Sequence, residues 1–262
     1  MNVTESGFKN RQLHIEDYLQ MVSAEQREYA EVFDYSKITE KSGVITDYWT
    51  NNLLDLILRK ENLNKAYKQV KSNKGSGGID GMQVDELLPY LRENQKTLIQ
   101  EIRDGKYKPN PVRRVEIPKE TKGEFRKLGV PTVVDRVIQQ AITQELTPIY
   151  EEQFSDNSFG FRPKRGAHDA LRQCQKNVND GYVYVVDMDL EKFFDTVCQS
   201  KLIEVLSRTI KDGRVISLIH KYLNAGVIAN GMFERTEIGM PQGGLCRARH
   251  KPPYDEINLM TS

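Results

Sequence analysis

The sequence predicts an α+β fold in which helices precede and separate short strands. Apolar residues recur at helical spacing in several segments, which indicates amphipathic helices. Two strand-like runs enclose a polar turn at 121–123, and a third apolar run starts at Tyr182. Hydrophobic residues make up 38% of the 262 residues, which is enough for a substantial core.

Residues 1–50 form an acidic leader in this interpretation. Residues 1–52 contain five lysines and arginines against nine acids, and two short helices are expected around 12–30. The first residues lack the basic and then apolar pattern of a secretory leader, and no apolar run approaches the ~20 residues that span a bilayer. We therefore expect a cytoplasmic protein without a membrane partner.

Two helices are expected after the leader. Over 52–71, apolar residues share one face, and the other face is basic, with Lys60, Lys65, Lys68 and Lys71. The glycine-rich stretch 74–81 reads as a turn and not as a phosphate-binding loop, because no strand precedes the glycines and no Lys-Ser or Lys-Thr follows. The second helix is expected over 84–103, with Gly105 after its end.

A β-hairpin is expected where runs 112–119 and 124–130 flank Thr121, Lys122 and Gly123. Residues 101–127 contain nine basic residues against five acids, so positive charge gathers where a phosphate group could lie. The alternative is a solvated basic surface. Further helices are expected over 133–154, 200–210 and 213–225, and the pair Asn230-Gly231 predicts a second hairpin over 227–238.

The run 182–195 leads an apolar strand directly into carboxylates and two aromatic residues. Strand side chains alternate, so Val183, Val185, Asp187 and Asp189 are expected on one face, with Asp189 at the strand end. A carboxylate there can bind a divalent metal, since Mg²⁺ prefers oxygen ligands. For an isolated Asp-x-Asp, capping of the following helix is an equally good interpretation.

Five more motifs stand in order along the chain. They are Arg113-Arg-Val-Glu-Ile-Pro-Lys119, Phe125-Arg-Lys-Leu-Gly-Val-Pro131, Asp135-Arg-Val-Ile-Gln-Gln140, Ser158-Phe-Gly-Phe-Arg-Pro163 and, over 239–244, Gly-Met-Pro-Gln-Gly-Gly. With the run 182–195 they closely resemble the reverse transcriptase of bacterial group II introns, the intron-encoded maturases. The resemblance extends from about residue 50 to Gly244. It implies right-hand polymerase fingers over 51–180 and a partial palm over 181–244, with residues 1–50 as a helical N-terminal extension.

The resemblance also implies roles for particular residues. Asp189 would bind the catalytic metal together with the backbone carbonyl of Leu190, and Asp187 is the competing ligand. Phe194 would abut the sugar 2′ position and exclude ribonucleotides, while Phe193 faces the core. The expected contacts to the incoming dNTP also include Lys119 and Arg126 on its triphosphate and Gln242 on its base or sugar, and those to nucleic-acid phosphates are Arg113, Arg162 and Arg165.

Several other polar or aromatic residues receive no functional role. Phe161 is expected to pack rather than to stack on a base. The four histidines lack metal-ligand spacing, and the three cysteines, Cys174, Cys198 and Cys246, fit neither a disulfide framework nor a zinc site.

The chain departs from the family at two places. Relatives commonly carry Arg-Pro-Leu-Gly where this chain has Arg126-Lys-Leu-Gly129, which keeps the arginine. After Gly244 relatives continue Pro-Leu-Ser-Pro and later a Tyr-Ala-Asp-Asp box with two further carboxylates, whereas 245–262 has neither. We expect 245–262 to be an aberrant, disordered tail, with the thumb absent and a frameshift or insertion near codon 245.

Two functions of different class follow from the resemblance. The first is an RNA-directed DNA polymerase that adds dNTPs to a DNA primer on an RNA template, using Mg²⁺ at a two-metal site that this chain leaves incomplete, so that the chain is expected to be inactive. The second is a non-catalytic fragment that binds group II intron RNA. A third possibility is a partly folded product without function, with an exposed sheet edge and poor solubility.

Overall fold

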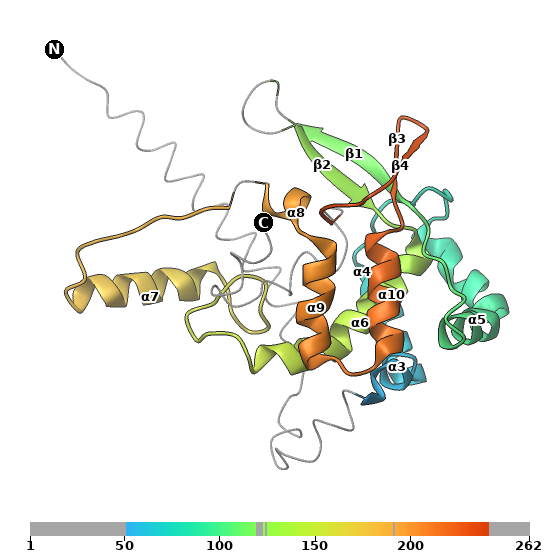
Figure 1. Cartoon of the computed structure of the whole chain (residues 1–262), viewed down its shortest axis with the longest axis horizontal. Helices are drawn as coiled ribbons and strands as arrows, with labels where there is room; N and C mark the ends of the chain where they lie inside the picture. Colours follow the sequence, from blue (N-terminus) through green and yellow to red (C-terminus); the bar gives the residue numbers. More distant parts are fainter. Residues whose placement is uncertain (1–50, 119–122, 124, 191, 241–262) are drawn as a thin grey trace. The chain divides into compact units, whose positions relative to one another are not determined.

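The computed structural model describes residues 51–118, 123, 125–190 and 192–240 (Figure 1). The described residues fall into two compact units. Residues 156–185 belong to the first unit, and residues 51–155 and 186–240 belong to the second. The predictions for the leader, for Lys119, for Gln242 and for the tail lie outside the described residues. No helix among the described residues is long and apolar enough to span a membrane.

The expected helix over 52–71 is divided into two helices. They are α3 (Leu53–Ile57) and α4 (Lys60–Ser72), and the backbone between them is extended at Arg59, with ψ 142°. The predicted faces are otherwise confirmed. Apolar residues of α3 are almost completely buried, and Lys60, Lys68 and Lys71 of α4 are exposed. Only Lys65 differs, because burial lowers the pKa of its amine.

The second predicted helix is confirmed as a 3₁₀ turn, η1 (Val84–Glu86), followed by α5 (Leu87–Arg103). Gly105 ends it with φ 66°, and the N–H of Lys106 donates to the carbonyl of Glu101 at 2.8 Å. Together with the bond from the N–H of Gly105 to the carbonyl of Ile102, this is a Schellman motif, whose left-handed position favours glycine.

Both predicted hairpins are present and join in one four-stranded sheet of order β2-β1-β3-β4. The first hairpin pairs β1 (Val112–Pro118) with β2 (Phe125–Val130), and the second pairs β3 (Val227–Ala229) with β4 (Met232–Glu234). Asn230 and Gly231 both have positive φ, as a two-residue hairpin turn requires. The sequence did not predict the parallel pairing of β1 with β3, which brings Val112 beside Val227.

Three longer helices complete the core of the second unit. They are α6 (Val133–Glu151), α9 (Gln199–Thr209) and α10 (Gly213–Leu223), all within a few residues of the expected ranges. The short helix α8 (Phe193–Thr196) comes directly before α9 in the chain. Thr132 begins α6, because its side chain accepts a hydrogen bond from the N–H of Asp135 at 3.2 Å.

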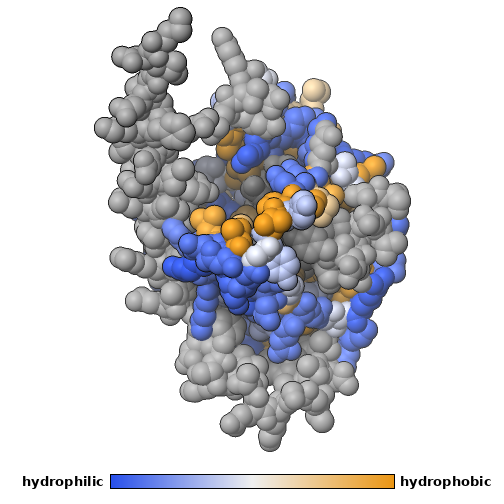
Figure 2. All heavy atoms as spheres, turned by 90° about the vertical axis from the view of Figure 1, so that its left-hand side faces the viewer, coloured by the Kyte–Doolittle hydropathy of each residue, from blue (hydrophilic) through white to orange (hydrophobic). Residues whose placement is uncertain are grey.

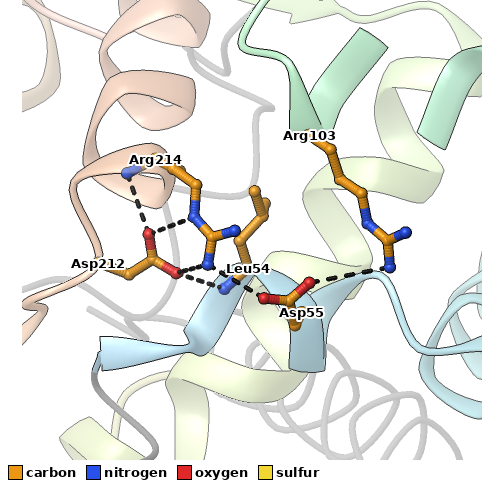
Figure 3. Close-up of polar contacts among 5 residues, drawn as sticks. All are labelled: Leu54, Asp55, Arg103, Asp212 and Arg214. Atoms are coloured by element: carbon orange, nitrogen blue, oxygen red, sulfur yellow. Dashed lines mark hydrogen bonds and ion pairs between the residues drawn. The ribbon is translucent and has the colours of Figure 1, made fainter. Parts of the chain in front are cut away.

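A chain of ion pairs connects three helices of this unit (Figure 3). The buried carboxylate of Asp212, which begins α10, accepts hydrogen bonds from the N–H of Leu54 at 3.0 Å and from Arg214 Nη2 at 2.8 Å. Arg214 also pairs with Asp55 of α3 at 3.1 Å, and Asp55 lies 3.8 Å from Arg103 of α5. These contacts connect α10 to α3 and α3 to α5.

The first unit contains α7 (Ala167–Asn179), a helix that the sequence analysis did not predict. The N–H of Gly166 donates to Asp169 at 2.9 Å, which is half of the reciprocal pattern that begins many helices. The acidic residue three positions after Gly166 was therefore a signal for this helix in the sequence. None of the side chains of α7 is buried, although Leu171 and Val178 are apolar.

The predicted palm strand is not formed. Residues 182–190 adopt no regular structure, all are exposed, and none of the strands described in the sheet pairs with them. A strand gains stability only from neighbours that take up its backbone hydrogen bonds, so apolar alternation alone cannot create one. The prediction that Val183, Val185, Asp187 and Asp189 share the face of a strand is therefore wrong for this structure.

Candidate nucleotide and nucleic-acid site

The first hairpin presents an exposed arginine close to its tip. Arg126 lies opposite Ile117 in the register, and Pro118 lies opposite Phe125 at the last described pair. The side chains of Ile117, Phe125 and Arg126 are all exposed. Because directly opposed residues of an antiparallel pair lie on the same face, Arg126 and Ile117 share one side of the hairpin. A guanidinium placed there can approach an anionic ligand from solvent.

Arg113, at the other end of β1, is engaged within the protein. Its Nε and Nη2 donate to the carbonyl of Gly77 at 3.3 and 3.0 Å, and Nη2 lies 3.2 Å from Ser76 Oγ. Arg136 of α6 donates to the carbonyl of Ser76 at 2.6 Å. Two arginines thus hold the glycine-rich turn against the base of the hairpin, and this turn is confirmed as a loop.

Arg162 and Arg165 belong to the first unit, where both guanidinium groups bond to the loop that precedes α7. Arg162 Nη1 donates to the carbonyl of Ser158 at 3.0 Å. Arg165 pairs with the carboxylate of Asp156 at 3.3 Å and lies over the ring of Phe159 at 5.7 Å. Phe161 has positive φ and is exposed, contrary to the expectation that it packs.

Asp187 and Asp189 are exposed on the segment 182–190. Asp189 Oδ1 accepts a hydrogen bond from the N–H of Leu190 at 2.9 Å, and the Leu190 carbonyl accepts one from the N–H of Phe193 at 3.4 Å. Carboxylate and carbonyl oxygens suit Mg²⁺. However, the part of the chain that the structure describes contains no group of three or more His, Cys, Asp or Glu side chains that could hold a metal ion. The donors are of the right kind, but they are too few.

The aromatic pair takes the arrangement that the sequence predicts. Phe193 is buried, and Phe194 is partly exposed, with the two rings edge to face at 5.4 Å. The turn is made possible by Lys192, whose backbone is left-handed with φ 49°. The prediction that Phe193 faces the core is confirmed.

Phe194 lies beside the start of the Gly-Met-Pro-Gln-Gly-Gly motif, although the two are far apart in sequence. The N–H of Met240 donates to the Phe194 carbonyl at 2.8 Å, and the N–H of Gly239 donates to the carbonyl of Val197 at 2.8 Å. Gly239 has φ 77°, and a Cβ there would lie 2.6 Å from the carbonyl oxygen of Asp195. Only glycine allows this approach, which brings two predicted dNTP-binding segments together.

Gln199 stabilises the contact between Phe194 and the glycine motif, and the sequence analysis did not identify this residue. Its buried Nε2 donates to the carbonyls of Gly239 at 2.9 Å, Thr236 at 3.1 Å and Leu223 at 3.3 Å. One amide therefore fixes the segment that leads to the glycine motif. Glutamine at the start of a helix carries no distinctive sequence signal, so pattern reasoning could not find it.

Asp135 is a second buried polar residue whose role the sequence did not show. Its carboxylate accepts hydrogen bonds from Tyr107 Oη at 2.6 Å, from Thr132 Oγ1 at 2.6 Å and from the N–H of Asn110 at 3.2 Å. Burial, reinforced by this carboxylate, raises the pKa of the Tyr107 hydroxyl well above its usual value. The network fixes the chain that enters β1 against the start of α6.

Residues 117–246 match the family model described as reverse transcriptase (RNA-dependent DNA polymerase). The group II intron-encoded protein LtrA of Lactococcus lactis subsp. cremoris is 36% identical over 209 residues, which are 80% of this chain and 35% of that protein. The chain belongs to the group II intron reverse transcriptases. The prediction of the family is thereby confirmed.

Two further curated proteins are similar to the chain over comparable lengths. Protein YkfC of Escherichia coli is 38% identical over 199 residues, 74% of this chain and 52% of that protein. A putative COX1/OXI3 intron 2 protein of Saccharomyces cerevisiae is 35% identical over 81% of this chain and 25% of its own. The chain thus spans between a quarter and about half of the length of these relatives.

Two solved structures, a partial Cas6-RT-Cas1–Cas2 complex and a Cas6-RT-Cas1–Cas2 complex, are similar with a TM-score of 0.48 and 20% identity, over 74% of this reverse transcriptase chain and 32% and 20% of theirs. The family match includes Arg126, Asp189 and Phe194, whereas Arg113 lies just before it. The strand β2, the acidic segment and the aromatic pair therefore all fall inside the matched segment.

Proposed function

We propose that this chain provides the fingers and part of the palm of an RNA-directed DNA polymerase that extends a DNA primer on an RNA template. Residues 51–180 are assigned to the fingers and 181–244 to the partial palm. The observation that carries the proposal is the contact between Phe194 and Met240, which brings the proposed sugar-contacting aromatic next to the glycine motif. This contact lies within the segment that matches the reverse transcriptase model.

Each predicted ligand contact has a separate task in this proposal. Arg126 on the exposed hairpin, with Lys119, would bind the triphosphate through charge-assisted hydrogen bonds. Phe194 would contact the sugar of the incoming dNTP and oppose a 2′-hydroxyl, while Gln242 would contact the base or sugar. Arg162 and Arg165 would contact nucleic-acid phosphates only if they leave their present partners in the loop.

Reverse transcriptases generally use divalent metal ions. Asp189 is proposed as one ligand, with the Leu190 carbonyl as a second and Asp187 as the competitor. Two exposed carboxylates are too few to hold two cations against water, so the described residues alone do not constitute a two-metal site. No catalytic step is assigned to them beyond this.

Primer extension tests the proposal directly. The purified chain is incubated with an RNA template, a DNA primer and dNTPs, with and without Mg²⁺, and product length is measured. Extension that requires Mg²⁺, that is lost in Asp189→Ala and that is retained in Asp180→Ala would support the assignment. Asp180 is an exposed aspartate at the end of α7 and serves as the matched control. Equal activity of both variants would contradict the role of Asp189.

A non-catalytic RNA-binding function is the second candidate, and two observations favour it. The described residues gather no metal-binding group, and α4 presents Lys60, Lys68 and Lys71 on its exposed face. Such lysines bind phosphates without sequence preference, and the affinity then falls as salt rises. Binding of group II intron RNA that weakens with salt, without any primer extension, would identify this function. Replacing the three lysines by glutamine should reduce the salt dependence.

A further inference from the structure

Asp135, in the first turn of α6, is the most deeply buried acidic residue among those that the structure describes, with 1% of its surface exposed. Hydrophilic residues instead cover much of the coloured surface in Figure 2. Acidic side chains are rarely buried unless partners compensate the loss of water. The hydroxyl of Thr132 already begins α6, so capping of this helix does not require a buried carboxylate at Asp135.

The carboxylate of Asp135 joins both ends of the first hairpin. Its Oδ2 accepts a hydrogen bond at 3.2 Å from the N–H of Asn110, which comes shortly before β1. The same oxygen accepts one at 2.6 Å from Oγ1 of Thr132, which comes shortly after β2. Hydrogen bonds weaken outside a narrow range of length and angle. A tilt of the hairpin relative to α6 would therefore weaken at least one of these two bonds.

The second oxygen of Asp135 extends this attachment to α10. Tyr107 Oη donates to Oδ1 at 2.6 Å, and Lys221 Nζ of α10 donates to the Tyr107 carbonyl at 3.1 Å. Strand β1 is also held by β3, since the N–H of Val112 donates to the Gly226 carbonyl at 3.0 Å. Strand β2 lies at the edge of the described sheet, where β1 is its only strand partner. The direction of β2 therefore depends on the bonds at its end.

Arg126 lies on β2 at a distance from this base. It stands six residues before Thr132, which corresponds to ~20 Å along an extended chain. A tilt of ~5° at the base would move the guanidinium by roughly 2 Å. A displacement of this size breaks a hydrogen bond between an arginine and a phosphate oxygen. Small changes at the base are thus enlarged at Arg126.

We propose that Asp135 is a positioning residue, which fixes the direction of the hairpin from both ends and thereby holds Arg126 in place for an incoming triphosphate. The part that concerns Arg126 rests on the proposed function, whereas the attachment of the hairpin does not. Asp135 itself contacts no ligand in this proposal. Two measurements, one of the hairpin and one of the ligand, keep these parts separate.

The first measurement uses N–H residual dipolar couplings of the complete chain, which report the direction of β1 and β2 relative to α6. Asp135→Asn replaces one acceptor oxygen by an amide that only donates, so at least one of the three donors loses its acceptor. The couplings of the hairpin should then no longer fit the alignment of α6. Asp212→Asn, the same substitution at the other buried aspartate of the described residues, should leave the fit unchanged because its bonds do not involve the hairpin.

The hydroxyl of Thr132 supplies a second pair of variants. Thr132→Val removes the hydroxyl and should reproduce the loss of fit, whereas Thr132→Ser retains the hydroxyl and should restore the parent couplings. Circular dichroism shows that each variant folds. If the hairpin of Asp135→Asn and of Thr132→Val stayed aligned with α6, or if Asp212→Asn disturbed it equally, the proposal would be overturned.

The second measurement is the affinity of the same variants for dTTP with Mg²⁺, by isothermal titration calorimetry. Asp135→Asn should weaken binding at least ~3-fold, and it should weaken binding no further in an Arg126→Ala background. Unchanged affinity in Asp135→Asn, together with binding that depends on Arg126, would contradict the positioning of Arg126. Binding of dTTP that is indifferent to Arg126→Ala would overturn the proposed function of Arg126 alone, and a misaligned hairpin would still support the attachment by Asp135.

Discussion

Asp212 is a buried carboxylate on which three helices depend. It begins α10, accepts a hydrogen bond from the N–H of Leu54 in α3, and orients Arg214 towards Asp55 (Figure 3). Removal of the carboxylate leaves a buried donor without its acceptor and an arginine without its closest anion. We expect Asp212→Ala to lower the free energy of unfolding by about 3 kcal/mol, measured by urea denaturation.

The control for this substitution is Glu93→Ala, which removes an exposed carboxylate from α5. It should change the free energy of unfolding by less than about 0.5 kcal/mol. If the two variants were equally stable, the bonds around Asp212 would contribute little to the fold.

Asp212 also makes stability depend on pH. Burial raises the pKa of its carboxyl, but hydrogen bonds from Arg214 and from the N–H of Leu54 outweigh burial, and the pKa lies below its ordinary value. A depressed folded pKa means that the stabilisation is present above the ordinary aspartate pKa of about 3.9 and is lost as pH falls through the folded value.

Thermal unfolding between pH 3 and 7 tests whether the stabilisation by Asp212 is lost as pH falls. The Tm difference between the parent and Asp212→Asn should be constant from neutral pH down to about pH 5 and should shrink below about pH 4. A difference that grew on acidification would mean that the carboxylate is protonated in the folded protein at neutral pH.

Substitution of Arg113 distinguishes a structural role of this residue from a nucleic-acid-binding role. Because its guanidinium bonds to Gly77 and Ser76, we expect Arg113→Ala to destabilise the protein by about 1–2 kcal/mol. The slope of RNA affinity against salt, measured by fluorescence anisotropy, should not change. A fall in that slope by about one would indicate a lost phosphate contact and would restore the role expected from the sequence.

At the scale of elements, the glycine-rich turn shows why one position must be glycine. A Cβ on Gly78 would lie 2.5 Å from the Cα and 2.7 Å from the backbone nitrogen of Thr132, which begins α6. Backbone cannot move aside as a flexible side chain can, so Gly78→Ala should lower the free energy of unfolding by about 2 kcal/mol in urea denaturation. Gly213→Ala in α10, where a Cβ meets nothing within 4 Å, should be neutral or stabilising.

Elements defined by local chemistry could be predicted from the sequence, whereas those defined by distant partners could not. The turn Asn230-Gly231 and Gly105 after α5 act within a few residues, and the hairpin of β3 and β4 and the end of α5 appear as expected. The pairing of β1 with β3 depends on residues more than a hundred positions apart. The strand over 182–190 failed for the same reason, since its alternation describes one half of a pair.

In the candidate site, too, local features could be predicted from the sequence, whereas contacts between distant residues could not. The family resemblance placed Phe193 in the core, and the structure shows it buried, whereas the role of Phe194 at the sugar stays a prediction. Gln199 and the Phe194–Met240 contact depend on the tertiary fold and could not be read from spacing. Arg113 and Arg165 show that a basic residue in a family motif can be bound to its own chain.

For the whole molecule, segment 182–190 contains one of the boundaries in sequence between the two units, at 185/186. Its side chains and backbone lack the packing that protects the helices of the second unit. Such a segment should open at almost no cost in free energy, whereas α6 should open only with global unfolding.

Limited proteolysis with chymotrypsin tests this difference. Within the described residues, the first cuts should follow Tyr182 and Tyr184, the latter with 94% of its surface accessible, while buried Tyr107 is spared. Mass spectrometry of the early fragments identifies the sites. Early cleavage at Tyr107, with Tyr184 intact, would show that the segment 182–190 is protected in the folded chain.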